Sequence, residues 1–303
     1  MEISMKPLFS DNGLYLKSFQ LFLERSTEHQ CIKWLIDENL PRVVASIGKK
    51  GAPYLNVLGV GSGSGQIDLE ILGKIQSQHP GRYIHNEVVE LNPQQISKYK
   101  ELVKEKGQGL NISFTWNQMS LEEYEKQNKE RKESKKFDFI HMIEVLYFVE
   151  SIHDTIKYFH SLLETNGKLL IIYTADDSGF HSLWEKVIPQ LPNNHLFSEI
   201  YKTLEEMRVK YRIYKLSSDM DITECFIERN ENGERLLDFL TQIVHFSETA
   251  PADLKDEVLH HLRQCILCEA RDIVEGLKEL ESHRPISNVL AHVAWLLVGL
   301  KSN

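Results

Sequence analysis

The chain is poor in cysteine and has no excess of basic residues. Four cysteines occur among 303 residues, and Cys31 and Cys225 stand alone. This usage is not that of a small secreted domain held by disulfides. Lysine and arginine number 35 against 44 aspartates and glutamates, a net charge of -9. Nucleic-acid binding needs clustered positive charge, so we expect no nucleic-acid partner.

A long apolar run is also missing. The longest, "VLAHVAWLLVGL" from Val289 to Leu300, contains His292 and is shorter than the roughly 20 residues that span a bilayer. No N-terminal segment joins a basic start to an apolar stretch, as a secretion signal does. We therefore expect a cytoplasmic protein, without a membrane partner, that acts as a monomer.

The pattern that is present predicts an α/β fold. The first 40 residues have helical periodicity, broken at "RSTEHQ", where Ser26 or Thr27 could cap a second helix. From Asn56 onward, short apolar runs alternate with amphipathic stretches. The runs are "YLNVLGVG", "RYIHNEVVE", "NISFTW", "FDFIHMIEVLYF", "KLLIIYT" and "YRIYKL". Such alternation indicates a mostly parallel, Rossmann-like sheet with helices on both faces.

The organisation predicted is a single domain over 1–303 with a core at about 40–216. The stretch at about 176–259 interrupts the strand–helix rhythm and is rich in aromatic residues. Ligands of such sheets bind beyond the carboxyl ends of the strands. Residues 1–39 and about 176–259 are therefore predicted to cover the substrate, and 258–303 forms a separate C-terminal segment.

The stretch "NVLGVGSGSGQIDLEIL" poses the question of which ligand its glycines hold. No lysine follows Gly65, which excludes a Walker A phosphate loop. The dinucleotide pattern G-x-G-x-x-G also fails, because its last slot holds Ser64 or Gln66. Gly61, Gly63 and Gly65 recur at every second position. This spacing resembles the first motif of class I S-adenosylmethionine-dependent methyltransferases, an acid followed by G-x-G-x-G.

The acid of that motif is absent, because Gly59 stands in its place. A second carboxylate is expected at the end of the next strand, where it can accept hydrogen bonds from both ribose hydroxyls of the donor. Glu90 closes "HNEVVE" at a suitable distance from the glycines. A glycine run by itself is equally compatible with a tight strand-to-helix turn. The flanking strand, the following helix and Glu90 together favour S-adenosyl-L-methionine as cofactor.

Longer motifs resemble the histamine N-methyltransferase family. They include "LFSDNGLYLKSF", "STEHQC", "NEVVE", "FDFIHMI", "MDITECFI", "NENGERLLDFLT" and "TAPADL", and they cover residues 1 to about 255. The resemblance implies a class I methyltransferase that methylates an imidazole ring nitrogen of a small amine. Donor contacts are then expected at Gly61, Gly63, Glu90, Gln95, Ser120 or its neighbour Leu121, and Ile143.

The same resemblance places Glu28 at the substrate amine. A carboxylate near the ring could accept the proton from the far ring nitrogen, which makes Glu28 and Glu144 the candidate catalytic residues. A buried ammonium needs a carboxylate counter-ion, although Glu28 could instead be an exposed capping side chain. Aromatic walls suit both an imidazole and a sulfonium, yet each aromatic could be plain core. The substrate-binding residues implied, besides the two glutamates, are Phe9, Tyr15, Tyr147, Phe180 and Trp184.

Three positions depart from the family. Glu144 replaces a glutamine that faces the substrate ring, Phe148 replaces a tyrosine, and Phe180 replaces a tryptophan. A roomier and more acidic pocket favours the dipeptide carnosine, which a branch of this family methylates to anserine. Sequence drift with histamine kept as acceptor is the alternative.

The C-terminal segment shares no motif with the family. "LHHLRQCILCEARDIVEGLKELESH" has a helical pattern, and "NVLAHVAWLLVGL" fits a helix or a final strand. If the closing strand is missing, a non-catalytic relative that only binds the donor becomes the alternative. Cys265 and Cys268 form one CxxC, a weak zinc signal that also fits a helix core. His141 is expected to be a satisfied core histidine rather than a catalytic one.

Overall fold

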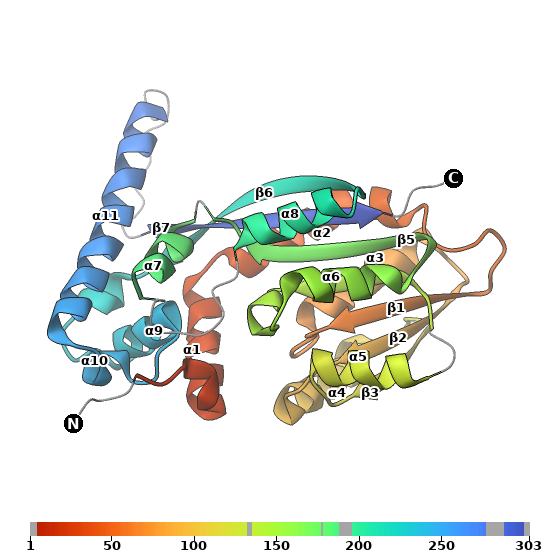
Figure 1. Cartoon of the computed structure of the whole chain (residues 1–303), viewed down its shortest axis with the longest axis horizontal. Coiled ribbons are helices and arrows are strands. Elements are labelled where there is room, and N and C mark those ends of the chain that lie inside the picture. Colours follow the sequence, from red (N-terminus) through yellow and green to blue (C-terminus); the bar gives the residue numbers. More distant parts are fainter. Residues whose placement is uncertain (1–4, 132–134, 177, 188–195, 277–287, 300–303) are drawn as a thin grey trace. The chain divides into compact units, whose positions relative to one another are not determined.

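The computed structural model describes residues 5–131, 135–176, 178–187, 196–276 and 288–299 (Figure 1), with backbone alone for parts such as 266–276 and 288–299. The chain divides into two compact units. The sheet unit comprises Ile32–Tyr173, His195–Lys215 and Ala294–Asn303. The helical unit comprises Met1–Cys31, Thr174–Asn194 and Leu216–Val293. That residues 1–39 and about 176–259 cover the substrate stays a prediction.

A seven-stranded sheet with the order β3-β2-β1-β4-β5-β7-β6 forms the framework. Five strands pair in parallel: β1 (Tyr54–Val60), β2 (Tyr83–Val89), β3 (Ile112–Asn117), β4 (Phe137–Ile143) and β5 (Leu163–Thr174). The predicted α/β fold with a mostly parallel sheet is therefore confirmed. The chain reverses its direction of growth between β1 and β4, and ligands of such sheets bind at this switch point.

Helices follow the strands of the sheet unit and bury their apolar faces on both sides of it (Figure 1). They are α2 (Glu28–Val44), whose first turn belongs to the helical unit, α3 (Gln66–Gln78), α4 (Pro93–Lys106), α5 (Leu121–Glu130), α6 (Ile152–Ser161) and α8 (Phe197–Glu206). Side chains of α5, α6 and α8 share one core cluster with β1, β4 and β5. Since continuous apolar strands need cover on both faces, the layers explain the unbroken burial of β4.

The helical unit has its own core. Its described residues include the short η1 (Leu8–Ser10) and η4 (Thr223–Phe226), the helices α1 (Asn12–Arg25), α7 (Gly179–Val187), α9 (Glu231–Thr241) and α10 (Phe246–Thr249), and the long α11 (Ala252–Gly276). Phe22 and Phe239 stack at its centre with ring centroids 4.6 Å apart. The helix break predicted at "RSTEHQ" is confirmed, because α1 ends at Arg25 and α2 begins at Glu28.

In the C-terminal segment, the described residues form one helix and one strand. The predicted helix is confirmed as far as Gly276, in α11 (Ala252–Gly276). The rest of the predicted stretch, 277–283, lies outside the described residues. The ambiguous apolar run is a strand, β7 (Asn288–Gly299), which lies between β5 and β6 (Lys210–Asp221) in the sheet. The divergent segment thus contributes a closing strand, which removes the structural reason for expecting a non-catalytic relative.

One predicted run is shorter than the sequence indicated. "FDFIHMIEVLYF" enters the sheet only as far as Ile143. Glu144 then has a φ of 49°, which is the left-handed region and ends the strand. The chain continues as the 3₁₀ turn η2 (Leu146–Phe148). This turn places Glu144 and Tyr147 at the carboxyl end of β4.

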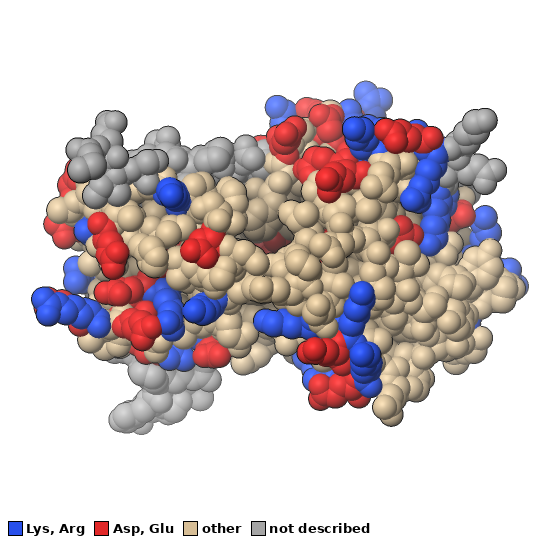
Figure 2. Space-filling model, turned by 90° about the horizontal axis from the view of Figure 1, so that it is seen from below, with Lys and Arg blue, Asp and Glu red and all other residues tan. Residues whose placement is uncertain are grey.

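Charges on the surface are mixed in sign. On the face shown in Figure 2, lysines and arginines are interspersed with acidic residues rather than gathered in one patch. Within the described part of the chain, no helix combines the length and the apolar character needed to cross a bilayer.

Candidate functional site

The glycine loop lies between β1 and α3, at the carboxyl edge of the sheet. Gly61, Gly63 and Gly65 have φ angles of 66°, 54° and 77°, a region in which other residues are strained. The Gly61 N–H donates to the Val89 carbonyl oxygen at 2.8 Å, which ties the loop to the end of β2. The alternating glycines therefore set the path of the backbone and hold it beside the neighbouring strand.

The three glycines face different surroundings. A Cβ on Gly61 would overlap the side chain of Val145, and one on Gly65 would overlap the ring of Tyr99. A Cβ on Gly63 would meet no atom within 4 Å. Gly61 and Gly65 thus permit close packing inside the protein. At Gly63 the backbone is instead accessible to a ligand, because no protein atom occupies the space on its Cβ side.

Glu90 follows the last residue of β2 and lies against this open backbone. Its Oε2 accepts a hydrogen bond from the Gly63 N–H at 2.9 Å, and its Oε1 accepts one from the Asn92 N–H at 2.8 Å. Burial raises the pKa of the Glu90 carboxyl, and the backbone donors oppose that effect. A carboxylate offers about four lone-pair sites, so acceptor capacity remains for further donors such as hydroxyl groups.

The other predicted donor contacts occupy the same edge. Gln95 is buried in the first turn of α4. Ser120 is the N-cap of α5: its Oγ accepts from the Glu123 N–H at 3.2 Å, and its own N–H donates to Glu123 Oε2 at 2.9 Å. Leu121 is partly buried against the core, and Ile143 is the last residue of β4. The Ser120 hydroxyl therefore has a structural role as a helix cap and retains its proton for a further bond.

Glu144 and Tyr147 form a pair just beyond β4. The Tyr147 hydroxyl donates to Glu144 Oε2 at 2.5 Å, and its ring stacks on Tyr173 with centroids 4.2 Å apart. Glu144 Oε1 is buried and has no hydrogen-bond partner within the described part of the chain. Burial raises the pKa of Glu144 from 4.5 to about 7, although the Tyr147 hydrogen bond opposes the shift. This carboxyl can therefore exchange a proton near neutral pH.

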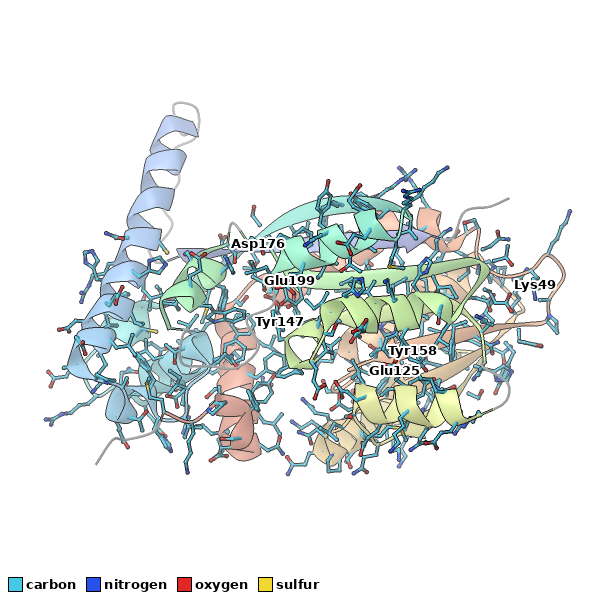
Figure 3. All side chains as sticks on the ribbon, in the orientation of Figure 1. Lys49, Glu125, Tyr147, Tyr158, Asp176 and Glu199 are labelled. Atoms are coloured by element: carbon cyan, nitrogen blue, oxygen red, sulfur yellow. The ribbon has the colours of Figure 1, made fainter. Side chains whose placement is uncertain are left out.

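Figure 3 shows the two opposite ends of the strands in the sheet unit. Tyr147 lies at one end of the strands, and Lys49, in the loop before β1, lies at the other. The glycine loop, Glu90 and the Glu144–Tyr147 pair all follow the carboxyl ends of parallel strands. The sheet unit thus gathers the predicted donor residues and Glu144 at the edge where such folds bind ligands.

Glu28 belongs to the helical unit and begins α2. Its N–H donates to Ser26 Oγ at 3.0 Å. The preceding break is fixed to the end of β6, since the Asp219 N–H donates to Thr27 Oγ1 at 2.8 Å. The side chain is 6% exposed, so the alternative of an exposed capping side chain is wrong. A buried carboxylate in this fixed position is a candidate counter-ion for an amine.

The predicted aromatic walls differ in exposure. Phe180 is buried in the core of the helical unit, edge-on to Trp184 at 5.9 Å, and Trp184 Nε1–H donates to the Leu240 carbonyl oxygen. Tyr15 is partly buried and stacks on Phe19. Phe9 in the helical unit and Phe148 in the sheet unit are about half exposed. Contact of any of them with a substrate stays a prediction.

Sequence reasoning missed Asp68, a buried carboxylate on α3 beneath the glycine loop. It is 2% exposed and lies 3.6 Å from His141 Nδ1. His141 is a core residue of β4 as expected, but its Nε2 has no hydrogen-bond partner among the described residues. The "QIDLEIL" pattern marks position 68 as part of a helix. Only the packing reveals that its side chain points under the loop.

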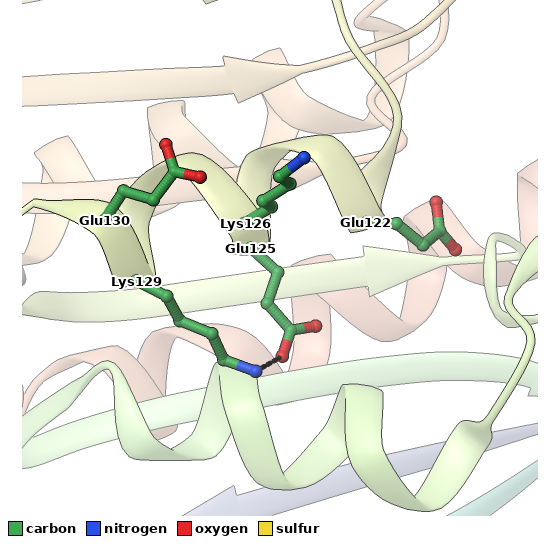
Figure 4. Close-up of a pocket in the computed structure, with 5 residues that line it drawn as sticks. All are labelled: Glu122, Glu125, Lys126, Lys129 and Glu130. Atoms are coloured by element: carbon green, nitrogen blue, oxygen red, sulfur yellow. Dashed lines mark ion pairs between the residues drawn. The ribbon is translucent and has the colours of Figure 1, made fainter.

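A hollow on the surface of α5 is lined by Glu122, Glu125, Lys126, Lys129 and Glu130 (Figure 4). Lys129 Nζ pairs with Glu125 Oε1 at 2.5 Å. Alternating charges on an exposed helix face are typical of a solvated surface. Among the described residues, no three His, Cys, Asp or Glu side chains are grouped as a metal would need. The Cys268 side chain lies outside the described set.

Comparison with known proteins gives consistent results. A family model described as a methyltransferase domain matches residues 28–207. Histamine N-methyltransferase of Xenopus tropicalis is 46% identical over 277 residues, 90% of this chain and 94% of the relative. Histamine N-methyltransferase of Danio rerio is 47% identical over 268 residues, 87% of this chain and 91% of the relative.

A solved structure supports the fold alone. The YcgJ protein of Bacillus subtilis superposes with a TM-score of 0.50 at 16% identity, covering 91% of this chain and 99% of its own. Neither of the two sequence relatives is named for a dipeptide acceptor. The expectation that carnosine is preferred over histamine therefore gains no support from them.

Proposed function

The chain belongs to the histamine N-methyltransferase family, as its motifs indicated, and on that premise we propose that it methylates histamine at an imidazole ring nitrogen with S-adenosylmethionine as donor. One observation carries the proposal. The backbone at Gly63 is open on the side where a Cβ would stand, and it donates to the Glu90 carboxylate at 2.9 Å.

These residues fit the donor. Glu90 keeps acceptor capacity for the two ribose hydroxyls, because each of its oxygens accepts one backbone N–H. Gly63 permits a close approach of the ligand to the backbone, while Gly61 lets the loop pack on Val145. Gln95, Ser120 with its neighbour Leu121, and Ile143 complete the proposed donor contacts at this edge. When bound, S-adenosylmethionine supplies an electrophilic methyl group on a positively charged sulfur.

The protein's own task is to orient the acceptor, exclude water and manage one proton. Neutral imidazole is already a competent nucleophile, because its pKa lies near 6.5. Alignment of the reacting nitrogen therefore accounts for most of the catalysis we propose. In its ionised form Glu144 can accept the proton from the other ring nitrogen and so select the reactive tautomer. The Tyr147 hydroxyl holds that carboxylate in place.

We propose that Glu28 binds the ammonium group of the acceptor. A buried carboxylate stabilises an ammonium when both are shielded from water and hydrogen-bonded, and Glu28 is 6% exposed. Tyr15, Tyr147, Phe180 and Trp184 are proposed as aromatic contacts of the acceptor. Their ring faces suit a flat heterocycle and a nearby cation.

The test is methyl transfer from labelled S-adenosylmethionine to histamine, with mass spectrometry to locate the methyl group. Product carrying one methyl on the ring is the expected result. A parallel binding titration with S-adenosylhomocysteine separates two failures. Binding without transfer to any imidazole would indicate a non-catalytic relative, and absence of binding would contradict the donor site itself.

Carnosine is a second candidate acceptor, favoured by one observation. Glu144, in place of the family's glutamine, introduces a carboxyl group whose buried Oε1 has no hydrogen-bond partner in the described part of the chain. A dipeptide has its own amine and extends further from the ring, so an additional carboxylate could pair with it. The same transfer assay with carnosine at equal concentration decides between the two, by the ratio of the kcat/KM values.

A further inference from the structure

Gly59 is required by packing rather than by backbone geometry. It lies in β1 directly opposite His141 of β4, and its φ is not in the left-handed region. A Cβ built on Gly59 would overlap Ser62 Oγ, and would lie 2.6 Å from Asp68 Oδ2 and 2.9 Å from His141 Cε1. The space that a side chain of residue 59 would occupy is therefore filled from helix α3 and strand β4.

One of the groups that fill this space, beside the Ser62 hydroxyl and the His141 ring, is a carboxylate. Class I methyltransferases carry an acid at the position of Gly59, two residues before the first glycine of the loop. Here Asp68 Oδ2 reaches the same location from the first turn of α3. A carboxylate therefore lies beside Gly59, although it belongs to Asp68 of helix α3 and not to strand β1.

Asp68 is held by neighbours that also contact the loop. The Tyr99 hydroxyl donates to Asp68 Oδ2 at 3.3 Å, and His141 Nδ1 lies 3.6 Å from Asp68 Oδ1. The Tyr99 ring packs under Gly65 so closely that no Cβ fits there. Ser62, at the other end of the loop, lies close enough to lower the pKa of Asp68, against the larger raising effect of burial.

The network therefore supports both ends of the segment that carries Gly63. Ser62 and Gly65 flank Gly63, and the Gly63 N–H donates to Glu90. The Asp68 charge also acts on Glu90 directly, because it contributes to raising the pKa of the Glu90 carboxyl. His141 Nε2 is buried in the same unit and has no hydrogen-bond partner in the described part of the chain.

We propose that Asp68 is a positioning residue for donor binding, which replaces from helix α3 the acid missing at Gly59 and holds the glycine loop in the shape that presents Gly63 to Glu90. This inference rests on the proposed donor site. It assigns Asp68 no contact with the donor and no chemical step. Its effect is on the affinity for the adenosyl ligand rather than on the acceptor.

The experiment is a calorimetric titration of S-adenosylhomocysteine into four proteins: wild type, Asp68→Ala, Asp68→Asn and the double variant Gly59→Asp with Asp68→Ala. Glu101→Ala, an exposed acid on α4, is the matched control. Asp68→Ala is expected to weaken binding at least tenfold. In the double variant the acid returns to the same space once the Ser62 and His141 side chains turn aside for the new Cβ, and its affinity is expected to recover to within about threefold of wild type. Melting temperatures are recorded for all five proteins.

The outcomes separate the possible explanations. Equal affinity in wild type and both single Asp68 variants would overturn the inference and leave the donor site intact. A variant that loses melting temperature but binds with wild-type affinity when folded would also overturn it, since that is the behaviour of a purely structural residue. If Asp68→Ala does not fold, Asp68→Asn carries the same comparison. Absence of binding by the wild type would instead contradict the proposed function.

Discussion

The Tyr147 hydroxyl donates a 2.5 Å hydrogen bond to Glu144 Oε2, three residues earlier in the chain, across a backbone turn in which Glu144 has a φ of 49°. The turn takes the chain out of the sheet and presents a carboxyl group at the carboxyl edge of β4. Burial makes that group hard to ionise. The stability and the acceptor preference of the protein should therefore both depend on the protonation of Glu144.

We expect Glu144→Gln to change how stability depends on pH. The folded-state pKa of about 7 lies above the ordinary value of 4.5. A raised pKa contributes stability that is fully present below pH 4.5 and is lost as the pH rises through 7. The glutamine variant has no charge to bury, so relative to wild type it should gain about 2 to 3 kcal/mol between pH 5 and pH 8. Urea unfolding at the two pH values measures this.

The control for that experiment is Glu150→Gln, because Glu150 is exposed on the same stretch of chain. Its difference from wild type should be the same at both pH values. A Glu144→Gln variant that behaves like Glu150→Gln would mean that the Glu144 carboxyl ionises as readily as a solvated one.

The same substitution should change the choice of acceptor. Glutamine removes the charge that could attract the amine of a dipeptide, while it keeps an oxygen that can accept from Tyr147. We expect the kcat/KM ratio of histamine to carnosine to rise by about fivefold or more, on the order of 1 kcal/mol. Competition between the two acceptors in one reaction, analysed by mass spectrometry, gives this ratio. An unchanged ratio would show that Glu144 does not discriminate between them.

Glu28→Gln should weaken acceptor binding and leave donor binding alone. Hydrogen bonds to charged groups contribute about 1.5–3 kcal/mol, so we expect the KM for histamine to rise roughly 10-fold to 100-fold. The Kd for S-adenosylhomocysteine should stay within twofold of wild type, because the ligand's contacts are proposed elsewhere. Glu24→Gln, an exposed acid of α1, is the matched control. Equal losses for both ligands would indicate a disturbed fold instead.

Two alanine substitutions in the glycine loop should impair different properties, ligand binding for Gly63→Ala and stability for Gly65→Ala. Gly63→Ala places a Cβ in open space, so we expect it to cost only about 1–2 kcal/mol of backbone strain but to weaken S-adenosylhomocysteine binding by tenfold or more. Gly65→Ala would overlap Tyr99, and we expect it to lower the free energy of unfolding by roughly 2–4 kcal/mol. Thermal unfolding and calorimetry distinguish the two. Wild-type affinity in Gly63→Ala would contradict the proposed position of the donor.

The sequence predicted the parts of the fold that local pattern controls. The alternation of apolar runs and helices gave the parallel sheet, and Ser26 and Thr27 marked the break before α2. The run from Asn288 to Gly299 could not be assigned, because short apolar runs are alike in buried helices and strands. The end of β4 at Glu144 was also hidden, since a left-handed residue that is not glycine has no sequence signal.

Site residues could be predicted where they belong to a recognisable sequence motif. Residues that come together only through the packing of separate elements could not be predicted. Gly63 and Glu90 were expected together, and the structure joins them by a hydrogen bond. The missing acid at Gly59 was visible, but its replacement was not. Asp68, His141 and Tyr99 are far apart in sequence and converge through the packing of α3 and α4 on the sheet.

The most direct test is the crystal structure of the wild-type protein with S-adenosylhomocysteine. The account predicts that both ribose hydroxyls lie within hydrogen-bond distance of the Glu90 carboxylate, with the ligand against the bare backbone at Gly63. A ligand bound elsewhere, or one whose ribose makes no contact with Glu90, would contradict it.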